Sequence, residues 1–177
     1  MKMYVGVKAH DEKEFCGVTR QFMDFEQYLM QYNGKPITKE ELEVDGYTVD
    51  EAFEKAIENT DNFKIFNLGE MFGSGAQNPL FVITRPDNIA FGAGYICNDK
   101  ALERIRNLFE EDYYIFPSSV HEFLVMPKSI AFKNGFDEMS MQQLVADVNR
   151  TQVIEEDRLS DSLYEYTKAN GLVRVEV

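Results

Sequence analysis

Two apolar runs that flank a short polar segment constrain the fold of this chain more than any other feature. Residues 113–116 (Tyr-Tyr-Ile-Phe) and 123–126 (Phe-Leu-Val-Met) are rich in β-prone side chains. Runs of about four to eight such residues, bounded by turn residues, are typical of buried strands. The polar segment between them, residues 117–122 (Pro-Ser-Ser-Val-His-Glu), is therefore predicted to lie where one buried strand ends and the next begins. It contains one of only two histidines in the chain.

From residue 80 onward, pairs of strands alternate with helices. The first predicted unit is a hairpin of strands 80–85 and 89–96, with its turn at 86–88, followed by a helix through 101–109 that Asn98 or Asp99 caps. The second unit consists of the strands at 113–116 and 123–126 and a helix capped by Ser140. A last hairpin pairs 162–166 with 172–177. Repeated strand-strand-helix units favour an α+β fold, with a largely antiparallel sheet and helices packed on one face. At 177 residues, a single domain over 1–177 is expected.

The first 60 residues contain one predicted strand and two predicted helices. Residues 3–9 alternate apolar and other side chains, which indicates a strand. Phe22, Phe25, Leu29 and Tyr32 recur at helical spacing, and Thr48 with Glu51 forms a capping box that begins a second helix.

Two features of the predicted helices and strands can be compared directly with a structure. Gly92 and Gly94 share a face of their predicted strand, which indicates a bulge or the close approach of another backbone. The apolar stripes of the helices predict buried side chains at eight positions, namely Val49, Phe53, Ile57, Leu102, Ile105, Phe109, Leu144 and Val148.

The net charge of −13 limits the classes of partner. The acidic residues are spread over the whole chain, so their field repels nucleic acid phosphates and attracts basic protein surfaces. Solubility is the simpler explanation of this acidity. No apolar stretch is long enough to cross a membrane and no secretion signal is recognisable, so a cytoplasmic protein is expected. Cys16 and Cys97 are accordingly predicted to be free thiols.

Several short motifs in order along the chain resemble an uncharacterised family, a domain of unknown function of gut clostridial bacteria and their mobile elements. The similarity extends from about Val44 to the C-terminus and leaves residues 1–43 unmatched. Its motifs are at 48–56, 59–60, 80–84, 92–95, 114–122, 147–153 and 159–162, and Pro-Ser-Ser-Val-His-Glu at 117–122 is the most specific. The resemblance implies a fold and a bacterial setting, but no activity.

The 117–122 segment supplies the candidate site residues, Ser118, Ser119, His121 and Glu122. On an extended strand Ser119 and His121 would share a face, with Glu122 on the other. A Ser-His pair can act as nucleophile and base, but two positions along one strand hold the side chains poorly for that role, and the sequence identifies no third, orienting group. The alternatives are a turn that satisfies its own hydrogen bonds and a binding site.

Metal and phosphate sites find less support. His10, Asp11, Glu12 and Glu14 lack the spacing of a metal site, and the Gly-rich stretch 69–78 lacks the Lys-Ser/Thr of a phosphate loop. No catalytic residue, metal or cofactor is predicted.

Three classes of function remain open. The first is a non-enzymatic protein-interaction or regulatory protein, such as a mobile-element accessory, with an unidentified protein partner and no direct contact with nucleic acid or membrane. The second is an acidic mimic of nucleic acid that inhibits a DNA-binding enzyme, which requires carboxylates aligned on one face. The third is a hydrolase that uses Ser119 and His121.

Overall fold

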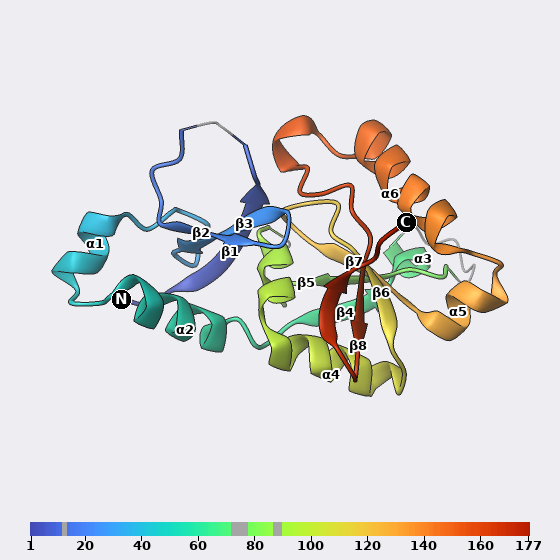
Figure 1. Ribbon diagram of the computed structural model, residues 1–177. Helices are drawn as coiled ribbons and strands as arrows, with labels where there is room; N and C mark the ends of the chain where they lie inside the picture. The colour runs from blue at the N-terminus through green and yellow to red at the C-terminus, as the bar shows by residue number, and fades with distance from the viewer. Residues whose placement is uncertain (12–13, 72–77, 87–89) are drawn as a thin grey trace.

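Two antiparallel sheets form the framework of the chain in a computed structural model, which describes residues 1–11, 14–71, 78–86 and 90–177 (Figure 1). The three-stranded sheet has the order β1-β3-β2, with β1 at Tyr4–Ala9, β2 at Thr19–Phe22 and β3 at Phe25–Met30. The six-stranded sheet has the order β4-β5-β7-β6-β8-β9, with β4 at Lys64–Asn67, β5 at Phe81–Thr84, β6 at Tyr113–Phe116, β7 at Phe123–Pro127, β8 at Tyr164–Thr167 and β9 at Gly171–Arg174. The α+β class and the antiparallel pairing are confirmed.

The helices lie at both ends of the molecule and between the sheets (Figure 1). Their bounds are Lys39–Val44 for α1, Val49–Asn59 for α2, Leu68–Met71 for α3, Asp99–Phe109 for α4, Lys128–Lys133 for α5 and Glu138–Gln152 for α6, with 3-10 segments at Gly92–Cys97 (η1) and Glu155–Asp157 (η2). The α2 helix packs on the three-stranded sheet, and η1 contacts β1 from that sheet and β5 from the other. The η1 segment therefore joins the two sheets.

Helices cover both faces of the six-stranded sheet, not one face as the sequence predicted. Side chains along β7 alternate: Phe123 and Val125 pack in the core shared with α2 and α4, whereas Met126 packs with α5 and α6. Because successive strand residues point to opposite faces, a strand that is apolar at every position has to be covered on both sides. The continuous apolar run at 123–126 contained this signal.

The helix predicted around residues 22–32 is wrong, because these residues form β2 and β3. Phe22 pairs with Phe25 across a two-residue turn in which Met23 has φ 54°. The spacing of Phe22, Phe25 and Leu29 fits the pattern of a helix, but the unbroken burial of Gln27–Met30 fits a strand better, since an amphipathic helix leaves one face exposed. Pairing with β1 decides between the two patterns.

The second strand of the predicted 80–96 hairpin is also wrong, since residues 92–97 form η1. The expected close approach of another backbone at Gly92 and Gly94 is confirmed. A Cβ on Gly94 would lie 2.0 Å from the Val5 carbonyl oxygen, and one on Gly92 would lie 2.6 Å from the His121 carbonyl oxygen. Residues 87 and 88 of the predicted turn and residue 89, where the second strand was predicted to begin, lie outside the described residues, as does most of the Gly-rich stretch 69–78.

Local signals at helix ends agree with the structure in most places. Thr48 and Glu51 form the expected capping box of α2, and Asn98 caps α4 through the backbone N–H groups of Lys100 and Ala101. The α6 helix begins earlier than predicted, because Asp137 is its cap and Ser140 is the reciprocal partner three positions later. The predicted C-terminal hairpin is present as β8 and β9.

The side chains predicted to be buried lie in the core where the whole helix packs on a sheet. Phe53, Leu102 and Ile105 are fully buried, and Val49, Ile57 and Phe109 are partly buried against the same core. Leu144 and Val148 are also only partly buried, because the face that α6 buries consists of Met141, Val145 and Asn149.

The two cysteines are free thiols, as predicted. Cys16 is exposed, whereas Cys97 is buried in η1, where burial raises the pKa of its thiol.

Asp24, in the turn between β2 and β3, links the two sheets. Its Oδ2 accepts hydrogen bonds from the Ser160 and Ser162 hydroxyls, each at 2.7 Å, and its Oδ1 accepts one from the Tyr164 hydroxyl. Burial alone would raise the pKa of Asp24, but these three donors outweigh it and hold the pKa below its ordinary value.

We expect Asp24→Asn to lower the free energy of unfolding at pH 7 by roughly 1–3 kcal/mol, because it weakens charge-assisted bonds. A carboxyl whose folded pKa is depressed stabilises the protein above its unfolded pKa, and this contribution is lost as pH falls through the folded pKa. The difference between the two proteins should therefore shrink below about pH 4. Urea unfolding at pH 7, 5 and 3 measures it, and Glu54→Gln, at an exposed position of α2, controls for the loss of one charge. A difference independent of pH would contradict this account of Asp24.

Candidate functional site

The 117–122 segment connects β6 to β7 and is hydrogen-bonded to two other parts of the chain. On one side the Val120 N–H donates to Asp157, and Ser118 accepts from the Leu159 N–H. On the other side the Gly92 N–H donates to the His121 carbonyl at 2.7 Å. The segment thus lies between η1 on one side and the end of η2 with the residues after it on the other.

Both ring nitrogens of His121 contact other groups of the protein. Nδ1 accepts a hydrogen bond from the Phe91 N–H at 3.1 Å, and Nε2 lies 3.2 Å from Oδ2 of Asp157. The Phe91 ring packs edge-on against the imidazole, with 5.4 Å between centroids. A nitrogen that accepts a backbone N–H carries no proton, so in the neutral ring Nε2 carries it and donates to Asp157.

Ser119 faces Glu122 and not the His121 ring. Its hydroxyl accepts the His121 backbone N–H at 3.0 Å and hydrogen-bonds with the Glu122 carboxyl. The expectation that Ser119 and His121 share a face, with Glu122 opposite, is wrong because the chain bends at residues 120–121 and period-two alternation fails there. A serine nucleophile needs a histidine nitrogen at its hydroxyl. Here both nitrogens are directed elsewhere, so the geometry does not favour a hydrolase.

Ser118 and Glu122 line a cavity of about 450 Å³ between α6 and the six-stranded sheet. The cavity is mostly apolar, and its lining comes from β4, α3, β5, the β6–β7 connection, β7 and the C-terminal part of α6. The residues that line it are Phe66, Leu68, Leu80, Val82, Thr84, Ser118, Glu122, Leu124, Val148, Gln152 and Val153. The structure thus divides the four predicted site residues, since Ser118 and Glu122 reach the cavity while His121 contacts Phe91 and Asp157.

Glu122 is the charged group of this cavity. Burial raises the pKa of its carboxyl, and the proximity of Asp157 acts in the same direction, while His121 and the Ser119 hydroxyl act against them. No lysine, arginine or histidine is among the described residues that line the cavity. A carboxyl beside apolar walls with no cation in the cavity favours a ligand with a donor or a positive charge.

Asp157 is the group that sequence reasoning missed. It stands in the acidic run Glu155–Asp157, which resembles a solvated loop, and it is 36 positions from His121 in sequence. An isolated β-bridge between Ser119 and Arg158, with the backbone hydrogen bonds beside it, brings the side chains of His121 and Asp157 together.

Replacing His121 with alanine is expected to destabilise the fold by about 1–3 kcal/mol, because the Phe91 N–H loses its acceptor. Chemical denaturation measures this loss. His10→Ala is the matched control, since the His10 side chain is 63% exposed and a change there should cost less than about 0.5 kcal/mol. Labelling of Ser118 or Ser119 by a fluorophosphonate, lost in His121→Ala, would instead support the hydrolase.

The described part of the chain shows neither a metal cluster nor a membrane span. No group of three or more His, Cys, Asp or Glu side chains there is arranged to hold a metal ion. His10 pairs with Glu26, which also binds Lys8, while Glu12 lies outside the described residues. None of the helices described has both the length and the apolar character to cross a bilayer.

Comparison with known proteins gives one match. The model of a family of unknown function, DUF5688, matches residues 22–168. The match begins before Val44, where the resemblance in the sequence began, and it includes β3, α1 and the whole 117–122 segment. No curated protein and no solved structure matches this chain.

Proposed function

Because this chain belongs to the DUF5688 family, whose function is unknown, we propose its function from its own cavity: it is a non-enzymatic binding protein for a small apolar molecule with an amine head group. The cavity between α6 and the six-stranded sheet holds the apolar part of the ligand, and Glu122 pairs with the amine.

The observation that supports this proposal is the position of Glu122 and Ser118 on the wall of a mostly apolar cavity. Cavities of roughly 300–1,000 Å³ with a few polar groups are typical of small-molecule sites. The apolar side chains supply the area to be buried, and the carboxyl fixes the orientation of the ligand. Val148, predicted to be buried, is only partly buried and lines this cavity.

Linear six-carbon probes test the proposal, because they differ only in the head group. We expect hexylamine to bind at least about tenfold more tightly than hexanol, and hexanoate to bind most weakly, because its charge repels Glu122. Isothermal titration calorimetry with the full chain measures the three dissociation constants. Equal affinity for the three probes, or tightest binding of hexanoate, would refute the assignment of the ligand.

Two variants separate the carboxyl from the cavity. Glu122→Gln should remove most of the preference for hexylamine over hexanol while the protein still binds hexanol. Val148→Trp should fill the cavity and weaken binding of both probes, whereas Val44→Trp, at a position that is 86% exposed, should change neither. Tight hexylamine binding in Val148→Trp would place the site elsewhere.

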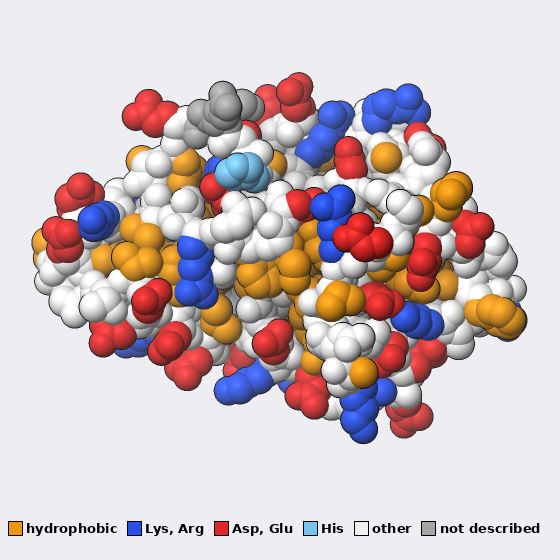
Figure 2. All heavy atoms as spheres, in the orientation of Figure 1, with side chains coloured by type: hydrophobic (Ala, Val, Ile, Leu, Met, Phe, Trp, Pro, Cys, Tyr) orange, Lys and Arg blue, Asp and Glu red, His pale blue; other side chains and the backbone are white. Residues whose placement is uncertain are grey.

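The acidic-mimic alternative has less support than ligand binding. Figure 2 shows acidic side chains on the visible face interspersed with lysine, arginine and apolar groups, without a continuous acidic band. A regulatory role with a protein partner, a mobile-element origin and a cytoplasmic location remain predictions from the sequence. A pull-down from cytosol with and without hexylamine would test whether ligand binding controls a partner.

A further inference from the structure

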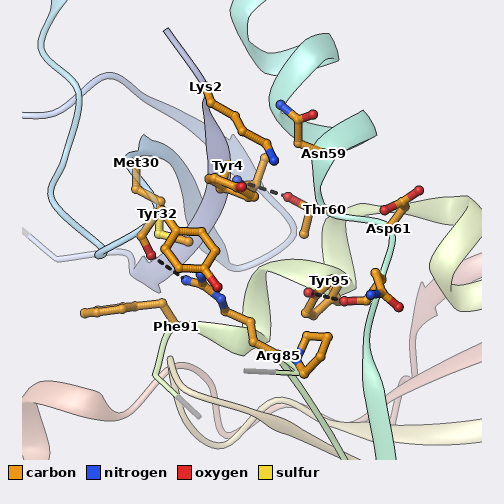
Figure 3. A pocket seen from close by; sticks show the side chains of 13 residues that line it. Lys2, Tyr4, Met30, Tyr32, Asn59, Thr60, Asp61, Arg85, Phe91 and Tyr95 are labelled. Atoms are coloured by element: carbon orange, nitrogen blue, oxygen red, sulfur yellow. Dashed lines mark hydrogen bonds between the residues drawn. The ribbon is translucent and has the colours of Figure 1, made fainter. Parts of the chain in front are cut away.

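A second cavity, of about 300 Å³, lies where β1, the end of β3, the end of α2 and η1 meet the residues after β5 (Figure 3). It is separate in composition from the cavity beside Glu122, with which it shares no residue. Its lining combines two basic side chains with aromatic rings. The residues that line it are Lys2, Tyr4, Val5, Met30, Tyr32, Asn59, Thr60, Asp61, Asn62, Arg85, Pro86, Phe91 and Tyr95.

Arg85 is the central group of this cavity. The residue is only 5% exposed, and its guanidinium lies 4.3 Å from the Tyr32 ring centroid and 5.6 Å from that of Tyr4. Nη1 donates a hydrogen bond to the Tyr32 carbonyl at 2.9 Å. Nη2 is buried and has no hydrogen-bond partner in the described part of the chain.

The positive charge of Arg85 is not neutralised by an acid among the described residues. None of their ion pairs includes it, although 31 Asp and Glu residues are present in the chain. A guanidinium keeps its charge in proteins, and a buried charge is costly unless it is paired and hydrogen-bonded. The Tyr32 carbonyl and two aromatic faces meet only part of this need. The edge formed by Nη1 and Nη2 has the geometry that binds a carboxylate or a phosphate through two parallel bonds.

The other walls of the cavity fit an anion with a flat body. Lys2 adds a second positive charge next to Tyr4, 5.6 Å from the ring centroid. In Figure 3 the carboxylate of Asp61 is directed away from Arg85, so the acidic group on the rim does not occupy the place of a ligand. The rings of Phe91 and Tyr95 provide further apolar surface, on which a planar ring can pack.

We propose that this cavity binds a small organic anion, a carboxylate or phosphate carried on a flat ring, whose oxygens bond to Nη1 and Nη2 of Arg85. The site is independent of the amine site proposed above, because the two cavities have no residue in common. A negative result with hexylamine would therefore not count against the anion site, and a negative result with the anions would not count against the amine site.

The probes for this site are benzoate, phenyl phosphate, benzyl alcohol and inorganic phosphate, each titrated against the full chain by calorimetry. We expect benzoate or phenyl phosphate to bind at least about tenfold more tightly than benzyl alcohol, because only the anions pair with Arg85. The tighter of the two identifies the oxyanion. If benzyl alcohol binds as tightly as both anions, the proposal is overturned. If inorganic phosphate binds as tightly as phenyl phosphate, the ring contributes nothing to the affinity, and the proposal of a ring-bearing ligand is wrong.

Charge-matched variants locate the binding. Arg85→Gln should weaken binding of the preferred anion at least about tenfold. Arg150→Gln removes the same charge at a side chain that is 75% exposed, outside the cavity, and should change the affinity less than about twofold. Lys2→Ala, at an exposed position, should weaken binding about threefold or more and provides a second variant in case Arg85→Gln does not fold.

Side-chain NMR of the unaltered protein provides a readout that needs no substitution. The guanidinium N–H signals of Arg85 should shift on addition of benzoate or phenyl phosphate and remain in place with benzyl alcohol. Saturable binding of the anions with no change in these signals would show that Arg85 is not the site.

Discussion

Replacing Phe53 with alanine is expected to lower the free energy of unfolding by about 3–5 kcal/mol. Phe53 is completely buried on α2, which packs against the three-stranded sheet in the larger core. The Arg20 guanidinium stacks on its ring at 4.1 Å, and Nε of Arg20 is buried without a hydrogen-bond partner among the described residues. The substitution therefore creates a cavity and also removes the aromatic face that supports a partly buried cation.

Urea denaturation of Phe53→Ala measures this loss, and two other phenylalanines provide a scale. Phe132 on α5 is 88% exposed, so Phe132→Ala should stay within about 0.5 kcal/mol of the unaltered protein. Phe109 is only partly buried, so its replacement should fall between the two. A loss below about 1 kcal/mol for Phe53→Ala would show that α2 does not pack as described.

The sequence correctly predicted those helix ends and strands whose structure depends on residues nearby in the sequence. The Thr48 capping box, the Asn98 cap and the strands on either side of the 117–122 segment are all present, because caps and short apolar runs are decided within a few residues. Residues 22–30 and 92–97 were predicted wrongly for the opposite reason. Pairing with β1 makes the first a hairpin, and packing between two sheets makes the second a 3-10 segment.

The candidate sites show the same limit more strongly. The position of the polar 117–122 segment between two apolar runs marked it as a candidate site, but the contact between His121 and Asp157 depends on distant parts of the chain. Arg85 gave no signal in the sequence, because a single arginine after an apolar strand resembles a solvated end. Its meaning comes from burial against Tyr4 and Tyr32 without an acid partner, and no linear pattern encodes that arrangement.

The 117–122 segment contacts residues of both proposed sites. Glu122 lines the apolar cavity, while the neighbouring His121 accepts a hydrogen bond from the N–H of Phe91, which lines the Arg85 cavity. The His121 carbonyl also accepts from Gly92, the first residue of η1. The segment therefore contacts residues of both cavities, although the two cavities have no lining residue in common.

Gly94→Ala is expected to destabilise the protein by more than about 3 kcal/mol, because the added Cβ would lie 2.0 Å from the carbonyl oxygen of Val5. That oxygen belongs to the backbone of β1, so it cannot move aside as a side-chain end can. Relief of the collision requires η1 to move away from β1, and η1 is the segment that joins the two sheets.

Gly46→Ala provides the control for this substitution. Gly46 has φ +75°, and no atom lies within 4 Å of the place that a Cβ would take, so alanine there brings backbone strain without a collision and should cost about 1 kcal/mol. Far-UV circular dichroism, gel filtration and urea unfolding compare the two variants. If Gly94→Ala were as stable as Gly46→Ala, β1 and η1 would not be in backbone contact. The Arg85 cavity, which β1 and η1 help to build, would then have a different shape, so this comparison also tests the framework of the proposed anion site.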